Sequence, residues 1–287
     1  MREFAQRRGL PYFLLAPGLA WLAVFFVVPM VFMFTISLYE GSLFTTYEFT
    51  WNWGNYSDAI TNFDTQFLRS FLYAGIATIL CALIAYPLAY AIAFKAGKYR
   101  SILLFLVVAP FFTTYLIRTY AWQTILSNDG FVVDTLTSVG LVDGRILKTP
   151  AAVIGGLTYN FLPFMILPIY GSLEQMDKRL VEAARDLYSS SATAFRKVTL
   201  PISMPGVVAG TLLTFIPAVG DYVNATFLGS TNQAMIGNVI QSQYLVTQDY
   251  QIAAALSFVM MALIVGIVLV YIKFAGSESL MGEDRAL

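Results

Sequence analysis

The chain has 287 residues, of which 58% are hydrophobic and 12% are charged. Soluble domains carry about 25% charged residues, so this composition excludes a soluble globule and indicates an integral membrane protein. The 17 basic and 17 acidic residues balance and give no indication of a nucleic-acid partner. The absence of histidine excludes His-based triads and His-ligated zinc. The single cysteine, Cys81, excludes a disulfide within the chain and is typical of packing.

Uncharged windows predict an all-α membrane protein, because about 20 apolar residues cross a bilayer as one helix. The basic start MREFAQRRGL resembles a signal peptide, but its apolar run is too long and lacks a cleavage site, so we expect a retained first span. The uncharged stretch 228–248 is rich in Gly, Ser, Thr, Asn and Gln, which favours an outer or re-entrant loop over a seventh span. The prediction is a single domain, 1–287, with six transmembrane helices at about 12–38, 70–94, 101–126, 151–171, 203–228 and 251–274.

Lysine and arginine set the orientation of membrane helices, because they accumulate on the cytoplasmic side. With a cytoplasmic N-terminus, 13 of the 17 basic residues lie inside, and the four outside are Arg69, Arg118, Arg145 and Lys148. Both termini are therefore predicted to be cytoplasmic. Nine of the 17 acidic residues then lie outside, and this surplus of acids would attract cations, although ordinary solvated loops explain it equally well.

Prolines and glycines inside the spans predict bends and close contacts. Each proline removes a backbone hydrogen bond, so kinked helices and a gated pathway are expected, although proline is also simply common in membrane helices. Gly206 and Gly210 have the spacing that lets two helices approach closely. The prolines concerned are Pro29, Pro87, Pro110, Pro163, Pro168 and Pro217.

No motif for ATP hydrolysis is present, because the only Gly-Lys pair, Gly97-Lys98, lacks the preceding glycine of a phosphate-binding loop. Metal-ligand spacings, nucleophile elbows and dinucleotide fingerprints are absent too. Two short patterns, Asn55-Tyr-Ser57 and Asn224-Ala-Thr226, match the glycosylation acceptor.

The longest inner connection, 172–200, contains a short amphipathic helix. Glu182–Tyr188 is rich in strong helix formers. Ser189–Ser191 predicts a break and a new N-cap, and Ala192–Val198 a second short helix. One interpretation is a surface helix at the lipid headgroups, and the other is a helix that docks into a groove of a soluble partner.

The spacing of Glu182-Ala183-Ala184 to Val198-x-Leu200-Pro201 resembles the EAA loop of ABC-importer permeases. The stretches Ala109–Trp122, Thr149–Leu187 and Ile216–Gly229 are similar to the spermidine/putrescine permease subfamily, B type. The resemblance covers nearly the whole chain. Tyr188 departs from it, because the family has glycine there; glycine tolerates a positive φ, and tyrosine does not.

The resemblance implies a type I importer permease fold in a bacterial inner membrane. It implies a second permease subunit, two cytosolic ATPase subunits and an external binding protein. ATP and magnesium would bind to the ATPases, and this chain would be no enzyme and hold no cofactor. The coupling segment would comprise Glu182, Ala183, Ala184, Asp186, Leu187, Tyr188, Leu200 and Pro201.

Polyamines are extended cations, so a site for them needs carboxylates and aromatic faces. Asp221 is the acid expected at the end of the fifth span, and an ionisable group there indicates a pathway. The aromatic candidates could equally form an interfacial belt, and Arg118 argues against a simple cation site, since it could pair with an acid or contact the binding protein. The aromatic candidates are Tyr222, Tyr115, Tyr120, Trp122 and Tyr159.

Other functions stay open at this point. The cargo could be thiamine, iron or an amino-acid derivative. A stand-alone channel or secondary transporter would normally need acids or histidines deep in its spans, which are nearly lacking here. A membrane enzyme is disfavoured by the absence of histidine and of clustered acids.

Overall fold

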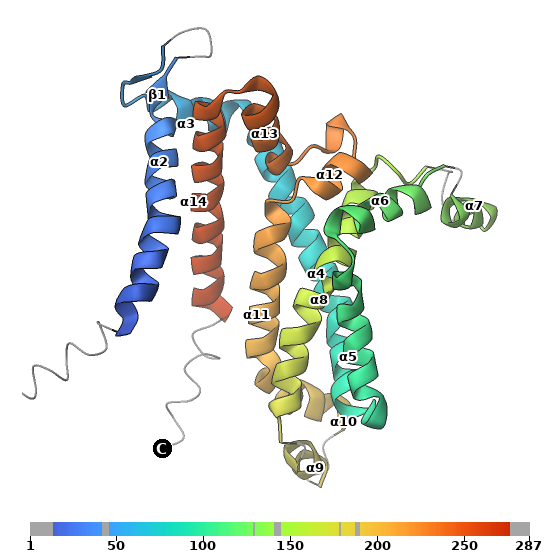
Figure 1. Cartoon of the computed structure of the whole chain (residues 1–287). Coiled ribbons are helices and arrows are strands. Elements are labelled where there is room, and N and C mark those ends of the chain that lie inside the picture. Colours follow the sequence, from blue (N-terminus) through green and yellow to red (C-terminus); the bar gives the residue numbers. More distant parts are fainter. Residues whose placement is uncertain are drawn as a thin grey trace, which may run out of the picture. The chain divides into compact units, whose positions relative to one another are not determined.

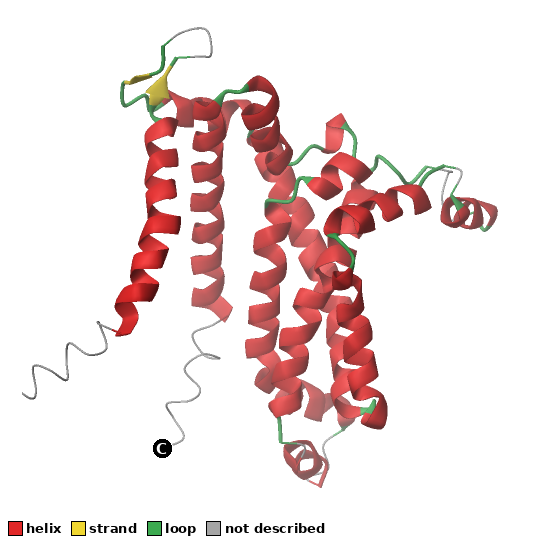
Figure 2. Cartoon of the chain, viewed as in Figure 1, coloured by secondary structure: helices red, strands yellow, loops and turns green. Residues whose placement is uncertain are grey.

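The computed structural model describes residues 14–41, 46–128, 130–140, 145–177, 179–186 and 190–275, and these residues are almost entirely helical (Figure 2). They form two compact units. One unit comprises Met1–Phe63 and Ile240–Met261, and the other comprises Asp64–Val239 and Ala262–Leu287. The single domain predicted for residues 1–287 stays a prediction.

The first unit begins with an apolar helix over Leu14–Ser37. It includes a π-helical turn and then α2, and it is followed by a small antiparallel hairpin in which Tyr39 lies opposite Phe49. The remaining helical parts of this unit come from α3 and from the region after Ile240. The bounds are η1 (Ala23–Val27), α2 (Val28–Ser37), β1 (Tyr39–Glu40), β2 (Glu48–Phe49), α3 (Gly54–Asn62), η6 (Gln243–Thr247) and the first part of α14 (Tyr250–Ala275).

The Asn55 side chain links α3 to the end of α2 by hydrogen bonds. Its Nδ2 donates to the carbonyl oxygens of Ser37 and Tyr39, each at 2.9 Å, and the residue is only 9% exposed. Phe34 of α2 meets Phe258 of α14 edge to face, with ring centroids 5.5 Å apart. The Asn55 amide therefore has a structural role, because it holds two helices together by hydrogen bonds. It is buried too deeply to serve as a glycosylation acceptor.

The second unit is a bundle built on three long helices, α4 (Asp64–Phe94), α8 (Pro150–Gln175) and α11 (Leu200–Val219), which lie side by side in Figure 1. α4 turns a stripe of small buried residues towards α8 at helical spacing, and small side chains let membrane helices approach closely. The stripe consists of Ala74, Ala77, Cys81, Ala85 and Ala89, all 0% exposed.

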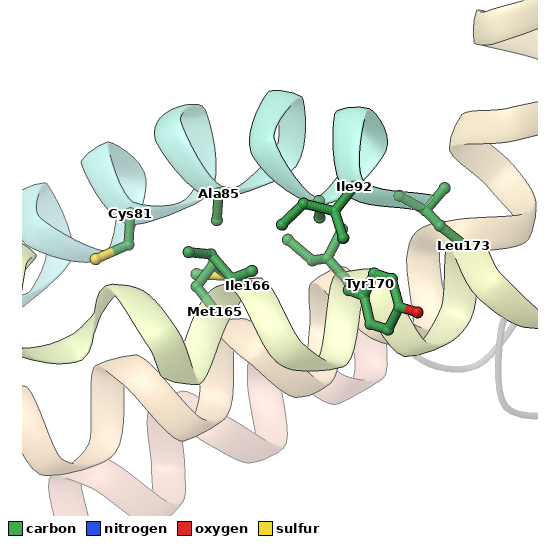
Figure 3. Packing of buried hydrophobic residues seen from close by; sticks show 9 residues of the cluster. Cys81, Ala85, Ile92, Met165, Ile166, Tyr170 and Leu173 are labelled. Atoms are coloured by element: carbon green, nitrogen blue, oxygen red, sulfur yellow. The ribbon is translucent and has the colours of Figure 1, made fainter. Parts of the chain in front are cut away.

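Apolar side chains of α4 and α8 interlock in the core of this bundle (Figure 3). Cys81 and Ile92 of α4 face Met165, Ile166 and the neighbouring apolar residues of α8. The Cys81 thiol donates to the carbonyl oxygen of Thr158 at 3.3 Å. The prediction that the lone cysteine is a packing residue is confirmed by its burial.

Gly206 and Gly210 lie where α11 crosses α8. A Cβ added to Gly206 would stand 2.5 Å from the backbone oxygen of Pro168, and one added to Gly210 would stand 2.8 Å from the sulfur of Met165. At either position an added methyl would force the neighbouring atoms of α8 to shift. The predicted close helix contact is therefore confirmed.

Shorter helices surround the bundle, and those of the inner segment are described with the site. The others are η2 (Gly97–Tyr99), α5 (Arg100–Val108), η3 (Ala109–Phe112), α6 (Tyr115–Ile125), α7 (Phe131–Ser138), α12 (Val223–Leu228), η5 (Thr231–Gln233) and α13 (Ile236–Ser242).

Within the described residues, five helices are long and apolar enough to cross a membrane, and a bent pair makes a sixth if it counts as one span. The five are Leu14–Ser37, Asp64–Phe94, Pro150–Gln175, Ser191–Val219 and Tyr250–Lys273. None falls in the stretch 228–248, where the chain instead forms α13 and η6. The all-α fold is confirmed, with two corrections to the predicted helices.

The third predicted helix, 101–126, consists of two helices, and the bend between them is much sharper than the kink expected at Pro110. Gly97–Phe112 and Tyr115–Ile125 meet at an angle of 93°. Thr113 and Thr114 adopt extended backbone between them, with ψ of 139° and 147°. Pro110 lies just before this break, and an uncharged window cannot register a change of direction.

The fifth predicted helix, 203–228, is wrong at both ends. One continuous helix begins at Ser191 and ends at Val219, and α12 starts afresh at Val223. The break falls at Gly220 and Asp221, where the Asp221 carboxylate accepts from the Asn224 N–H at 2.7 Å and so caps the new helix.

Candidate functional site

The segment that joins α8 to α11 leaves the bundle at the end opposite α12 (Figure 1). α8 ends at Gln175, and Met176, only 6% exposed, anchors the exit. The Asp177 carboxylate then accepts from the Arg179 N–H at 2.9 Å. This cap starts α9 (Arg179–Asp186) three residues beyond the buried anchor.

Most of the predicted coupling residues lie on α9. Glu182, Ala183 and Asp186 are exposed, and Ala184 is half-buried. Glu182 and Asp186 are four residues apart, so they share one face of the helix. Leu187 and Tyr188 lie outside the described residues. Their place in the coupling segment, and the consequence of a tyrosine where the family has glycine, therefore stay predictions.

The return to the bundle begins at Ser190, whose hydroxyl accepts from the Thr193 N–H at 3.2 Å. This confirms the predicted N-cap in the serine run. The helix that follows is continuous through α10 (Ser191–Ala194), the π-helical turn η4 (Phe195–Thr199) and α11. The prediction of a separate short helix over Ala192–Val198 is therefore wrong, and the extent of the cytoplasmic loop, 172–200, stays a prediction.

Leu200 is half-buried and Pro201 exposed, and both lie inside this continuous helix. The Leu200 N–H bonds to the Phe195 carbonyl five residues earlier. Pro201 has no N–H to donate, and the π-helical turn shifts the hydrogen-bond register just before it. The helix therefore passes the proline without ending.

The second group of candidate residues meets in a buried cluster between α6, α8 and α12. We call Tyr115, Thr119, Asn160, Asp221 and Asn224 the polar cluster. The Tyr115 hydroxyl donates to Asp221 Oδ2 and accepts from Asn224 Nδ2 at 2.6 Å. Asn160 Nδ2 lies 3.2 Å from Asn224 Oδ1 and 3.4 Å from Thr119 Oγ1.

Asp221 is 8% exposed, and each of its carboxylate oxygens accepts a hydrogen bond. Burial raises the pKa of the Asp221 carboxyl above its ordinary value, and the hydrogen bonds from Tyr115 and Asn224 oppose that rise. A cation that approaches Asp221 therefore meets a carboxylate that already accepts hydrogen bonds from Tyr115 and Asn224. Within the described part of the chain, no three Cys, Asp or Glu side chains gather to hold a metal ion.

Arg118 lies beside the polar cluster and is 8% exposed. Its guanidinium carbon stands 5.2 Å from the Phe111 ring centroid and 5.6 Å from that of Tyr115, a cation–π arrangement that strengthens when the charge is desolvated. Among the described residues, its Nε and Nη1 have no hydrogen-bond partner, and it pairs with no acid. Arg118 therefore lies against the rings of Phe111 and Tyr115, and not beside an acid, as was one of the predictions for it.

The remaining aromatic candidates divide into two kinds. Trp122 and Tyr159 contact each other edge to face, with ring centroids 5.2 Å apart, and link α6 to α8. Tyr120 is 61% and Tyr222 42% exposed, and neither belongs to the polar cluster. The structure thus brings Tyr115 to Asp221 and Trp122 to Tyr159.

Sequence reasoning missed Asn160 and gave Asn224 a different role. Asn224 is 0% and Asn160 1% exposed. The Asn224 amide bonds to Tyr115 and Asn160 and cannot serve as a glycosylation acceptor. The available signal was an amide inside an apolar span, which is costly unless it finds a partner.

Residues 85–275 match the family described as binding-protein-dependent transport system inner membrane component. This match covers well over half of the chain. The chain belongs to this family. It is therefore a multi-pass inner-membrane protein and a transport component, not itself an enzyme. Membership implies ATPase and binding-protein partners, and it excludes the stand-alone channel and the secondary transporter.

Relatives in several bacteria are similar to this chain in sequence over most of its length. The spermidine/putrescine transport system permease protein PotB of Haemophilus influenzae is 39% identical over 88% of this chain and 90% of its own length. The protein of that name in Escherichia coli is 36% identical over 87% of this chain and 91% of its own.

A solved structure of a bacterial ABC transporter that imports the acidic polysaccharide alginate has a chain with a TM-score of 0.71 to this one. The two chains are 18% identical, and the match covers 96% of this chain and 98% of the other. A chain of the MetNI methionine ABC transporter gives a TM-score of 0.52 at 19% identity. The predicted permease fold of ABC importers is confirmed.

Proposed function

We propose that this chain is one of two permease subunits of an ATP-driven importer of polyamines such as spermidine and putrescine. The observation that carries the proposal is the 36–39% identity to two spermidine/putrescine permeases over nearly the full length of both chains. The alternative cargoes are thiamine, iron or an amino-acid derivative. The second permease subunit would form the opposite wall of the pathway.

The chemistry of the polar cluster suits an extended cation. An ammonium group of the cargo can replace the Tyr115 hydroxyl on the Asp221 carboxylate, because the charged donor forms the stronger hydrogen bond. The rings of Trp122 and Tyr159 offer aromatic faces to a second ammonium or to the methylene chain. Tyr120 and Tyr222 would contribute from the exposed surface of the same region.

The coupling proposal assigns α9 to a groove on a cytosolic ATPase subunit. Two exposed acids, Glu182 and Asp186, lie four residues apart on α9, and like charges at that spacing repel each other. Basic residues in a partner groove would relieve the repulsion. Ala183, Ala184, Leu187 and Tyr188 would supply the apolar contacts, and Leu200 and Pro201 the helix by which the segment returns.

Substituting Glu182→Ala tests the coupling proposal. The variant should lose co-purification with the ATPase subunits and ATP-dependent uptake, because the acid meets the partner directly. Glu48→Ala, which removes an exposed acid on β2, is the matched control and should change neither. A Glu182→Ala complex that assembles and transports like the wild type would refute the role of α9.

The ATPase activity of the reconstituted four-part complex tests the cargo. Spermidine or putrescine, presented on the binding protein, should stimulate hydrolysis, whereas thiamine, ferric iron and amino-acid derivatives should not. Stimulation by one of these other solutes alone would assign a different cargo to the same fold.

A further inference from the structure

Arg100 and Glu174 each occupy the helix end that disfavours their charge. Arg100 is the first residue of α5, at its positive end, and Glu174 is the last but one of α8, at its negative end. Neither residue is explained by the stability of its own helix. Their side chains form an ion pair that offsets both conflicts.

Arg100 also holds α8 at a second point one turn earlier. Its Nε–H donates to the Tyr170 hydroxyl, and its guanidinium carbon lies 5.0 Å from the Tyr170 ring centroid. Tyr170 is 6% exposed and packs in the apolar core, with its hydroxyl directed away from Met165 and Ile166 (Figure 3). Arg100 therefore joins the start of α5 to a rigid part of α8.

Apart from Arg100, α5 packs against the core of the bundle through the partly buried side chains of Leu103, Leu104 and Val107. None of its residues is fully buried, and an apolar groove lined by Ile92, Leu103 and Ile166 runs between α4, α5 and α8. The Arg100 and Glu174 side chains are 38% and 42% exposed. Exposed ion pairs add little to stability, so the arrangement points to a positional role.

We propose that Arg100 is a positioning residue that makes α5 move together with the inner end of α8. The proposal rests on the proposed docking of α9, because α9 begins only five residues after Glu174. α5 leads through η3 and two extended residues to α6, which carries Tyr115 of the polar cluster. Arg100 thus links the motion of the coupling segment to the polar cluster by a route separate from α8 itself.

The Arg100→Gln variant should assemble normally and hydrolyse ATP, while polyamine uptake per ATP falls by about fivefold or more, as expected for an ordinary coupling free energy. Lys98→Gln is the control, because it removes the same charge from the preceding turn, where the side chain lies over its neighbour Tyr99. This variant should leave polyamine uptake per ATP unchanged. The charge-swapped double variant Arg100→Glu with Glu174→Arg should regain coupling relative to either single variant.

A second readout does not depend on the cargo. Cys81 is the sole cysteine and is buried, so Thr124→Cys on α6 gives a single accessible label. Nucleotide binding to the complex should change its labelling rate, and Arg100→Gln should remove that change. If Arg100→Gln does not assemble, Glu174→Gln carries the same test, because it keeps the Tyr170 contact.

Unchanged uptake per ATP together with an unchanged nucleotide response would overturn the role of Arg100, as would a charge swap no better than the single variants. Failure of the wild-type complex to transport polyamines would instead reject the cargo, and the labelling experiment would still decide the role of Arg100.

Discussion

Tyr115 shows how one side chain joins elements that are far apart in the sequence. Its hydroxyl lies between Asp221 and Asn224, more than a hundred residues away, and its ring lies against Arg118. The hydroxyl donates to Asp221 and accepts from Asn224, so it serves both partners at once. Tyr115 is therefore the central residue of the polar cluster.

Substituting Tyr115→Phe should lower the stability of the purified permease by about 1–3 kcal/mol, because a buried carboxylate oxygen and a buried amide lose their partner. Thermal or denaturant unfolding measures the loss. Tyr120→Phe, which alters a ring 61% exposed, is the control and should be neutral. Equal effects of the two variants would contradict the role given to the Tyr115 hydroxyl.

The sequence indicated Asp221 and Tyr115 separately, since an acid and an aromatic at the edge of apolar windows are conspicuous. It could not indicate that they bond, because no local pattern relates residues 106 positions apart. Asn160 went unnoticed because a single amide hardly changes the hydropathy of a long span. Only tertiary packing reveals which buried polar groups are partners.

At the scale of elements, the long helices were predictable, whereas their breaks were predictable only in part. Charge-free windows located α4, α8 and α14 closely, because the bilayer imposes length and apolarity. The 93° bend after Phe112 and the break at Gly220 depend on backbone angles of a few residues. Pro110 indicated a kink near the first break but not its angle, and Asp221 at the second gave no sign that it caps a new helix.

The crossing of α8 and α11 gives a sharp prediction at this scale. Gly206→Ala would place a methyl 2.5 Å from the Pro168 backbone oxygen, so it should cost about 1–3 kcal/mol through overpacking. Gly155→Ala, on α8 with open space around the new methyl, is the matched control. The control should be neutral or stabilising, because alanine favours helix over glycine. Unfolding midpoints of the two variants compare them directly.

The whole molecule has the features of one part of a larger assembly. The most apolar window of the first helix, Leu14–Ser37, has no residue buried within the chain. Its large apolar side chains must face lipid or another subunit. Family membership implies partner proteins, and this helix is one surface on which the proposed second permease subunit could pack.

The central claim is tested most directly by uptake of labelled spermidine into proteoliposomes that contain this chain, its second permease, both ATPases and the binding protein. The account predicts uptake that requires ATP and is abolished by excess unlabelled putrescine but not by thiamine. Failure to accumulate spermidine, while the same vesicles accumulate thiamine, iron or an amino-acid derivative, would contradict it.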